Sequence, residues 1–212
     1  NKIKTRFREP ILVPKTIPLY VMEHLFATMY QELSNAHTNY QKKRVLLDIA
    51  ICETLFSTGM RISELCNLKS SDVDLHDATI RIYGKGSKER IIQIGNSDVI
   101  KILNEYTTVY MAGISKSGFF FTKPNATPLS DQAIRRMIRK YCSLASIDLH
   151  ITPHMFRHTF ATSLLEADVD IRYIQEMLGH SSITVTEIYT HVALSKQRDI
   201  LTSKHPRKDF KI

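Results

Sequence analysis

The sequence predicts a mainly α-helical domain that carries a small antiparallel β-sheet. Over most of the chain, apolar residues recur at intervals of three and four, which is the spacing of amphipathic helices. Alternation of apolar and polar residues is clear only in 78–94 (ATIRIYGKGSKERIIQI), where two glycines mark a turn between two strands. With 212 residues, the chain is long enough to bury a substantial core.

The helices are predicted from periodicity and from end signals. The first begins after Pro18, and the second, 44–59 (RVLLDIAICETLFSTG), is apolar on nearly every side. We therefore expect the second to be the central buried helix and to end near Gly59. The other expected helical segments are 60–68, 98–110, 130–144, 152–167, 170–180 and 182–194.

Charge and cysteine content narrow the classes of partner and compartment. The net charge is +8 and the pI is about 9.4, so a polyanion such as DNA is the leading partner. No apolar run approaches the roughly 20 residues of a membrane span, and no secretory signal stands at the start. Cys52, Cys66 and Cys142 are too scattered for a disulfide framework or a zinc motif, which favours free thiols in a reducing cytosol.

The predicted helix 130–144 has a basic face opposite its apolar stripe. Such a face could lie along a phosphate backbone, although most basic helix faces are simply solvated. Two hairpin residues, Lys88 and Arg90, are further candidates for DNA contact. The basic residues of the helix are Arg135, Arg136, Arg139 and Lys140.

The stretch 151–160 (ITPHMFRHTF) concentrates cationic side chains at a predicted helix start. Thr152 suits the N-cap position and Pro153 suits the first helical position. His154 and Arg157 then lie on one face, one turn apart, beside the positive end of the helix dipole. Two cations at such a place would suit a phosphate ligand.

A zinc site is the main alternative for the same stretch. His154 and His158 have the four-residue spacing of a helical zinc pair, but Met155 stands where zinc hydrolases of that motif carry glutamate. Arg157 would also repel a divalent cation. A capping histidine beside a surface arginine is the structural alternative for either residue alone.

Other candidate residues are ambiguous when each is taken alone. Arg61 with Glu64 could be an ordinary surface pair, and Lys85 between two glycines could be a simple turn residue. His180 follows a glycine that ends a helix, and Tyr189 could be half-buried packing. As a nucleophile, Tyr189 would need cations close to its target phosphate.

Five motifs in order resemble those of the tyrosine recombinase (phage integrase) family, and the bacterial Xer-type branch closely. The resemblance covers residues 18–192 and implies the catalytic-domain fold of these DNA breaking and rejoining enzymes. Each fragment alone is weak, but five at the family's usual separations are specific. The motifs are TGMRISEL (58–65), GKGSKER (84–90), HMFRH (154–158), LGHSS (178–182) and IYTHV (188–192).

The resemblance implies site-specific recombination without a metal, another cofactor or ATP. Arg61 and Arg157 would grip the scissile phosphate of double-stranded DNA and stabilise its pentacoordinate transition state. Tyr189 would attack phosphorus, forming a 3′-phosphotyrosyl bond and releasing a 5′-hydroxyl. That bond conserves the energy of the broken ester, so the strand can be joined to a different 5′-hydroxyl.

The remaining family positions imply supporting roles in the same reaction. Lys85 would protonate the leaving oxygen, His154 would transfer a proton with the nucleophile, and His180 would hydrogen-bond the phosphate. Glu64 resembles the family's supporting carboxylate, which orients Arg61 or His154. His158 is expected to support the site or to be structural.

The resemblance also predicts domain organisation and assembly. We expect residues 1–16 to be a basic linker after a missing core-binding domain, 17–192 to be the catalytic domain, and 193–212 to be a tail that docks on another protomer. The full-length protein should form a homotetramer on DNA, and the isolated domain should be a monomer. Its location should be the cytoplasm, at the nucleoid, and mobile-element integration is favoured over chromosome-dimer resolution.

Two further functions remain as alternatives. A type IB topoisomerase uses the same chemistry but rejoins the original strand, and the LGHSS motif favours recombination over it. The chain could also be a DNA-binding fragment with weak catalysis.

Overall fold

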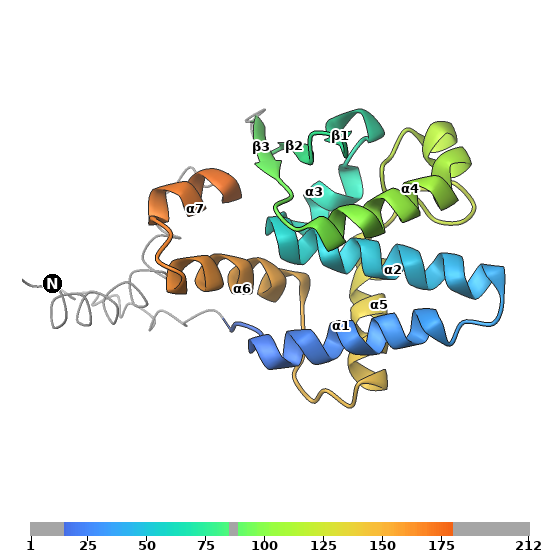
Figure 1. The fold of residues 1–212 in the computed structure, drawn as a ribbon, viewed down its shortest axis with the longest axis horizontal. Coiled ribbons are helices and arrows are strands. Elements are labelled where there is room, and N and C mark those ends of the chain that lie inside the picture. The colour runs from blue at the N-terminus through green and yellow to red at the C-terminus, as the bar shows by residue number, and fades with distance from the viewer. Residues whose placement is uncertain (1–14, 85–88, 180–212) are drawn as a thin grey trace, which may run out of the picture.

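Helix α2 (Asn39–Thr58) is the centre of the fold in the computed structural model, which describes residues 15–84 and 89–179. It packs against α1 (Leu19–Ser34), α4 (Ser97–Ser117) and α6 (Pro153–Glu166) (Figure 1). Thr38 and Gln41 form a capping box at its start, and Gly59 ends it in the left-handed conformation. The predicted central buried helix is therefore confirmed.

The other described elements surround α2 and bury their apolar faces against it or against one another. All the predicted helices within the described residues are present, and α4 extends to Ser117, beyond the expected end at residue 110. These elements are α3 (Ile62–Asn67), the 3₁₀ turn η1 (Ser70–Asp72), β1 (Val73–Asp74), β2 (Thr79–Tyr83), β3 (Glu89–Gln93), α5 (Asp131–Leu144) and α7 (Ile171–Leu178).

The sheet is antiparallel, with strand order β1–β2–β3, at one edge of the helical body (Figure 1). Ile80 lies opposite Ile92, and Ile82 lies opposite Arg90. Directly opposed residues share a face, so Arg90 points to the same side as the buried Ile82. Strand β1 was not predicted, because two residues are too few to show alternation. The predicted class, mainly α with a small antiparallel sheet, is confirmed.

A separate apolar cluster attaches α7 to α6. Ala161 and Leu165 from α6 pack against Ile174 and Leu178 from α7, and all four are buried. This small cluster holds the last described helix, so the position of α7 depends strongly on polar contacts described below. Among residues 15–84 and 89–179, no helix is both long and apolar enough to cross a membrane.

Ile17 and the three cysteines are buried in the helical body. Ile17 is buried, and its backbone N–H donates to Thr159 Oγ1 at 2.8 Å, which ties the chain to α6 at that point. Cys52, Cys66 and Cys142 are all free and buried, as expected for thiols without a disulfide partner.

Candidate active site

The N-terminal end of α6 places His154 and Arg157 as predicted. Pro153 is the first helical residue and Thr152 occupies the N-cap position, although the Thr152 side chain makes no capping hydrogen bond. His154 is exposed in the first turn, whereas Arg157, one turn later, is only 5% exposed. The helix start thus presents an imidazole at the surface and a guanidinium beneath it.

Arg157 joins three segments of the chain. Its Nη1 donates to the carbonyl of Gly59 at 2.8 Å, and its Nη2 donates to the carbonyl of Leu178 at 2.7 Å. Both acceptors are uncharged, so they fix the plane of the guanidinium without neutralising its charge. The end of α2 and the end of α7 are thereby held to α6.

Gly59 allows this approach because it lacks a side chain. Its φ is +60°, and an added Cβ would lie 2.5 Å from Phe160 Cδ1 and 2.9 Å from Leu178 Cδ2. Any other residue would strain the backbone and push α6 and α7 away from the end of α2. The glycine that precedes Arg61 by two positions is therefore required by packing as well as by its backbone angle.

Arg61 and Glu64 are more than an ordinary surface pair. Glu64 accepts from the Arg61 backbone N–H at 2.8 Å and from Arg61 Nη1 at 2.9 Å. The Glu64 side chain is only 6% exposed, whereas that of Arg61 is 38% exposed. A buried carboxylate is thus bonded to a partly exposed guanidinium, and its supporting role in the site stays a prediction.

Arg90 is the second cation on Glu64. Its Nη1 and Nη2 donate to Oε1 and Oε2 of Glu64 at 3.0 and 2.8 Å, and its Nε donates to the Met177 carbonyl at 2.7 Å. The Arg90 side chain is 9% exposed. This placement does not fit the expectation that Arg90 contacts DNA, because its guanidinium is directed into the protein.

The two arginines decide the charge of Glu64. Burial by itself would raise the pKa of this carboxyl, but hydrogen bonds from Arg90 and Arg61 outweigh burial and leave the pKa below its usual value. Glu64 therefore remains ionised at neutral pH and keeps its hold on both guanidinium groups.

His154 lies in a positive environment built from three helices. Its pKa is lowered by partial desolvation and by the charges of Arg135 in α5, Arg157 in α6 and Arg61 at the start of α3. The pKa of His158 is also lowered, by burial and by His154 and Arg157. Cations gathered in this way, with a neutral imidazole among them, suit an anionic ligand.

The basic face of α5 is formed as predicted. The apolar stripe is buried, Arg135 is half-buried towards His154, and Arg136, Arg139 and Lys140 are exposed. Contact of these side chains with DNA stays a prediction.

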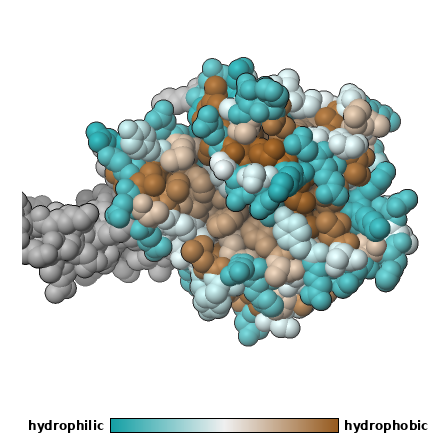
Figure 2. All heavy atoms as spheres, viewed as in Figure 1, coloured by the Kyte–Doolittle hydropathy of each residue, from teal (hydrophilic) through white to brown (hydrophobic). Residues whose placement is uncertain are grey.

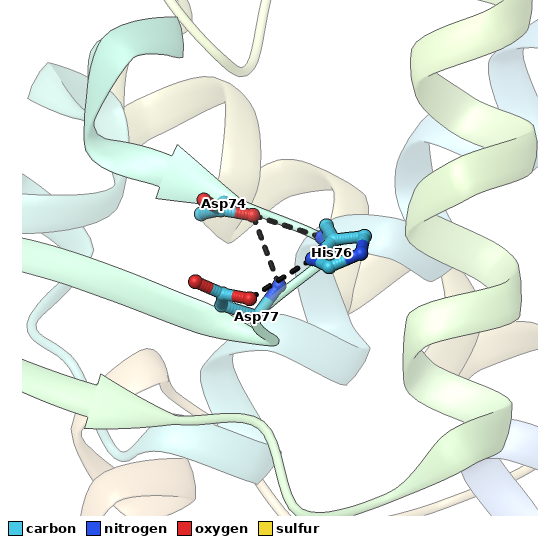
Figure 3. Close-up of side chains that lie close together, drawn as sticks. All are labelled: Asp74, His76 and Asp77. Carbon is cyan, nitrogen blue, oxygen red and sulfur yellow. Dashed lines mark hydrogen bonds and ion pairs between the residues drawn. The ribbon is translucent and has the colours of Figure 1, made fainter.

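The described residues offer one group that could hold a metal, and it lies away from these cations. Asp74 at the end of β1 and His76 and Asp77 in the turn that follows are exposed, with ligand atoms within 4.8 Å of one another (Figure 3). Asp74 Oδ1 accepts from the backbone N–H groups of His76 and Asp77, and His76 Nδ1 lies 2.9 Å from Asp77 Oδ1. These contacts account for the cluster as a turn.

Several predicted site residues lie outside the described residues. They are Lys85, Lys88, His180 and Tyr189, together with residues 1–14 of the predicted linker 1–16, the predicted helical segment 182–194 and the tail 193–212. Their roles stay predictions. The described chain resumes at Glu89, next to Arg90, and ends at Gly179.

Sequence reasoning missed the structural importance of Arg90 and Gly59. A signal for Arg90 was present, because the alternation that turns Ile92 and Ile94 inward also turns Arg90 inward. The partner of Arg90 could not be found in this way, since Glu64 lies 26 positions earlier in the chain.

Comparisons with known proteins identify the family of this chain. The model of the phage integrase family matches residues 24–196. A tyrosine recombinase of Agathobacter rectalis is 68% identical over 210 residues, covering 99% of this chain and 69% of that protein. The tyrosine recombinase XerC of Bacillus pumilus is 42% identical over 164 residues, covering 74% of this chain and 53% of that protein. The chain thus spans about half the length of its Xer relatives.

Solved structures show the same fold. The crystal structure of XerA recombinase has a TM-score of 0.75 at 33% identity and covers 93% of this chain and 68% of that one. XerH recombinase bound to its difH substrate has a TM-score of 0.71 at 24% identity and covers 94% of this chain and 56% of that one. The second likeness supports the fold alone. On its motifs, its fold and its relatives, this chain belongs to the phage integrase family of tyrosine recombinases.

Proposed function

We propose that the chain is the catalytic part of a site-specific recombinase that breaks and rejoins double-stranded DNA through a 3′-phosphotyrosyl intermediate. The observation that carries the proposal is the gathering of Arg61, Arg157 and His154, which come from separate parts of the chain and share one electrostatic environment. Each of the two arginines is fixed by protein acceptors, as a preorganised phosphate site requires.

In the proposed reaction, the hydroxyl oxygen of Tyr189 attacks the scissile phosphorus. The bond to the 5′-oxygen breaks, Lys85 gives that oxygen a proton, and the 3′-phosphate remains on the tyrosine. Arg61 and Arg157 stabilise the added negative charge of the transition state, and His180 hydrogen-bonds the phosphate. Attack of another 5′-hydroxyl reverses the steps and joins a new strand.

His154 has properties suited to proton transfer in this scheme. Partial burial and three neighbouring arginines lower its pKa, so its imidazole is largely neutral at neutral pH and can accept the tyrosine proton. A bound phosphate would stabilise the protonated form that results. His158 is half-buried in the same helix and is proposed to support the site.

The proposed partner is a recombination site in duplex DNA, read by a homotetramer of the full-length protein in the cytoplasm, at the nucleoid. The basic face of α5, including Arg136 and Arg139, is proposed to follow the DNA backbone. Integration of a mobile element remains the preferred biological role. We prefer this role because mobile-element integrases are the larger class. The base sequence of the recombination site is not part of the proposal.

Docking of the tail 193–212 on another protomer is part of the proposed assembly. A cavity of about 700 Å³ opens between α1, α2, α4 and α6, lined by Phe56, Ile102 and Phe160 among others. Figure 2 shows apolar side chains exposed among polar ones on the face that carries these helices. The cavity offers such a tail an apolar site, and the polar groups Asp98 and Lys101 at its wall are paired with each other.

The proposal is tested by trapping the covalent intermediate. Bound duplexes are first selected from a randomised pool, and a nicked form of the selected duplex is incubated with the protein in EDTA. We expect an adduct on a denaturing gel with the wild type and with Tyr173→Phe, which alters an exposed tyrosine of α7. Tyr189→Phe should give none.

A metal requirement, or an adduct that survives Tyr189→Phe, would overturn the mechanism. Relaxation of supercoils without strand exchange by the full-length protein would instead favour the topoisomerase alternative.

A further inference from the structure

Arg90 joins β3 to α3 and to the end of α7. It belongs to β3, and its side chain passes inward beneath α3 and reaches the end of α7. All three donor nitrogens of its guanidinium are engaged, two with Glu64 and one with Met177. A guanidinium held in this way fixes the groups that it contacts, because it cannot rotate without breaking a hydrogen bond.

The first connection runs from Arg90 to Arg61. Glu64 receives a bidentate pair from Arg90 on one side and the backbone and side chain of Arg61 on the other. Without Arg90, the buried carboxylate would keep only the Arg61 contacts and could rotate towards water. The direction of the Arg61 guanidinium therefore depends on Arg90 through Glu64.

The second connection runs from Arg90 to Arg157. The carbonyls of Met177 and Leu178, neighbours in the last turn of α7, accept from Arg90 and Arg157 respectively. The carbonyl end of a helix carries partial negative charge, so it suits two cations. Gly179 lets Arg90 lie against this turn, since an added Cβ would come within 3.0 Å of Arg90 Nη1.

We propose that Arg90 is a positioning residue for DNA cleavage, which sets Arg61 through Glu64 and sets Arg157 through the last turn of α7. The inference rests on the proposed function, because it assumes that both arginines bind the scissile phosphate. The Arg90 side chain is only 9% exposed and is bonded to Glu64 and Met177, so its proposed action is indirect. Its loss should slow the chemical step and leave DNA affinity nearly unchanged.

The test uses the intact protein and the nicked duplex selected above. Adduct formation is measured in single turnover at saturating DNA, and DNA affinity is measured separately by gel shift. We expect Arg90→Gln to slow adduct formation by roughly 10- to 100-fold with affinity within about twofold, because misplacement of transition-state contacts costs rate. Arg90→Lys, which keeps the charge but loses the fork, should fall between Arg90→Gln and wild type.

The matched control is Arg172→Gln. Arg172 lies on α7 but is exposed and forms an ion pair with Asp170. The variant should therefore form the adduct at the wild-type rate. The variant Glu64→Gln supplies the second comparison. If Arg90 acts through Glu64, the effects of Arg90→Gln and Glu64→Gln should not add. The rate of the double variant should then lie within about twofold of the rate of the slower single variant.

Failure of the proposed function and failure of the positioning role would give different results. Loss of the Tyr189-dependent adduct from the wild type would refute the proposed function itself. A normal rate in Arg90→Gln, an equal loss of rate and affinity, or additive effects with Glu64→Gln would refute the positioning role while the function stands. If Arg90→Gln fails to fold, Arg90→Lys decides the question, and a wild-type rate in that folded variant would contradict the inference.

Discussion

Two buried carboxylates, one in the helical core and one in the candidate site, behave in opposite ways. Asp48 in α2 is 9% exposed and accepts a hydrogen bond from the neutral Tyr141 hydroxyl at 3.0 Å. Burial raises its pKa to about 6. Glu64 is buried as well, but two arginines hold its pKa below the usual value. The charge of the partners, more than burial, decides which carboxylate stays ionised.

The two carboxylates belong to two parts of the domain that are held together by different interactions. The core around α2 is held by apolar packing, and its buried carboxylate Asp48 can become neutral at little cost. The junction of α3, β3, α6 and α7 is held by charged and dipolar contacts to Glu64, Gly59 and the end of α7. We expect changes at the junction to alter both stability and catalysis, and changes in the core to alter stability alone.

The largest expected effect comes from filling the space at Gly59. Gly59→Ala places a Cβ against Phe160 and Leu178 and adds backbone strain at a φ of +60°, so we expect a loss of about 3 kcal/mol or more in unfolding free energy. Gly118→Ala is the control, because φ there is +72° but no atom lies within 4 Å. It should cost about 1 kcal/mol. Urea denaturation measures both, and equal losses would show that packing at Gly59 is unimportant.

The second effect concerns the core carboxylate. The folded-state pKa of Asp48 lies above the value of about 4 for an unfolded aspartate, so the folded protein binds the extra proton. Stability should therefore fall as pH rises from about 4 to about 6, by an amount on the order of 3 kcal/mol, and should change little from this source above that window. Asp48→Asn should remove this fall, as measured by denaturation across the pH range.

Glu64→Gln tests the carboxylate of the junction in the same way. The folded-state pKa of Glu64 is lowered, so its contribution to stability is present at neutral pH and is lost in acid. The variant should be destabilised at neutral pH and should approach wild type at low pH. If the stability of Asp48→Asn and that of Glu64→Gln, each relative to wild type, changed with pH in the same way, the distinction between core and junction would be contradicted.

The smallest effect is electrostatic and needs no change in fold. Arg135→Gln removes one of the cations that lower the pKa of His154, so that pKa should rise. Titration of the His154 ring proton by NMR measures the shift. Arg136→Gln, one position further along α5 and exposed, is the control and should leave the pKa nearly unchanged. A larger shift in the control would place His154 in a different environment from the one described.

Local patterns predicted the elements of the fold well, because periodicity and caps act over a few residues. The stripe of α5, the central α2 and the hairpin strands follow from spacing, and the start of α6 follows from a proline at the first helical position. The contacts between Arg90 and Glu64, and between Arg157 and Gly59, join residues far apart in the chain. No local spacing reveals such pairs, so the motifs indicated which residues matter without showing how they are held.

The central claim is that Arg61, Arg157 and His154 form a phosphate site at which Tyr189 becomes joined to DNA. Mass spectrometry of the protease-digested adduct, formed in EDTA on the nicked duplex, tests it most directly. We expect one modified peptide, with the 3′-phosphate of the cleaved strand on Tyr189. A phosphate on any other residue, or cleavage that leaves no covalent link to protein, would contradict it.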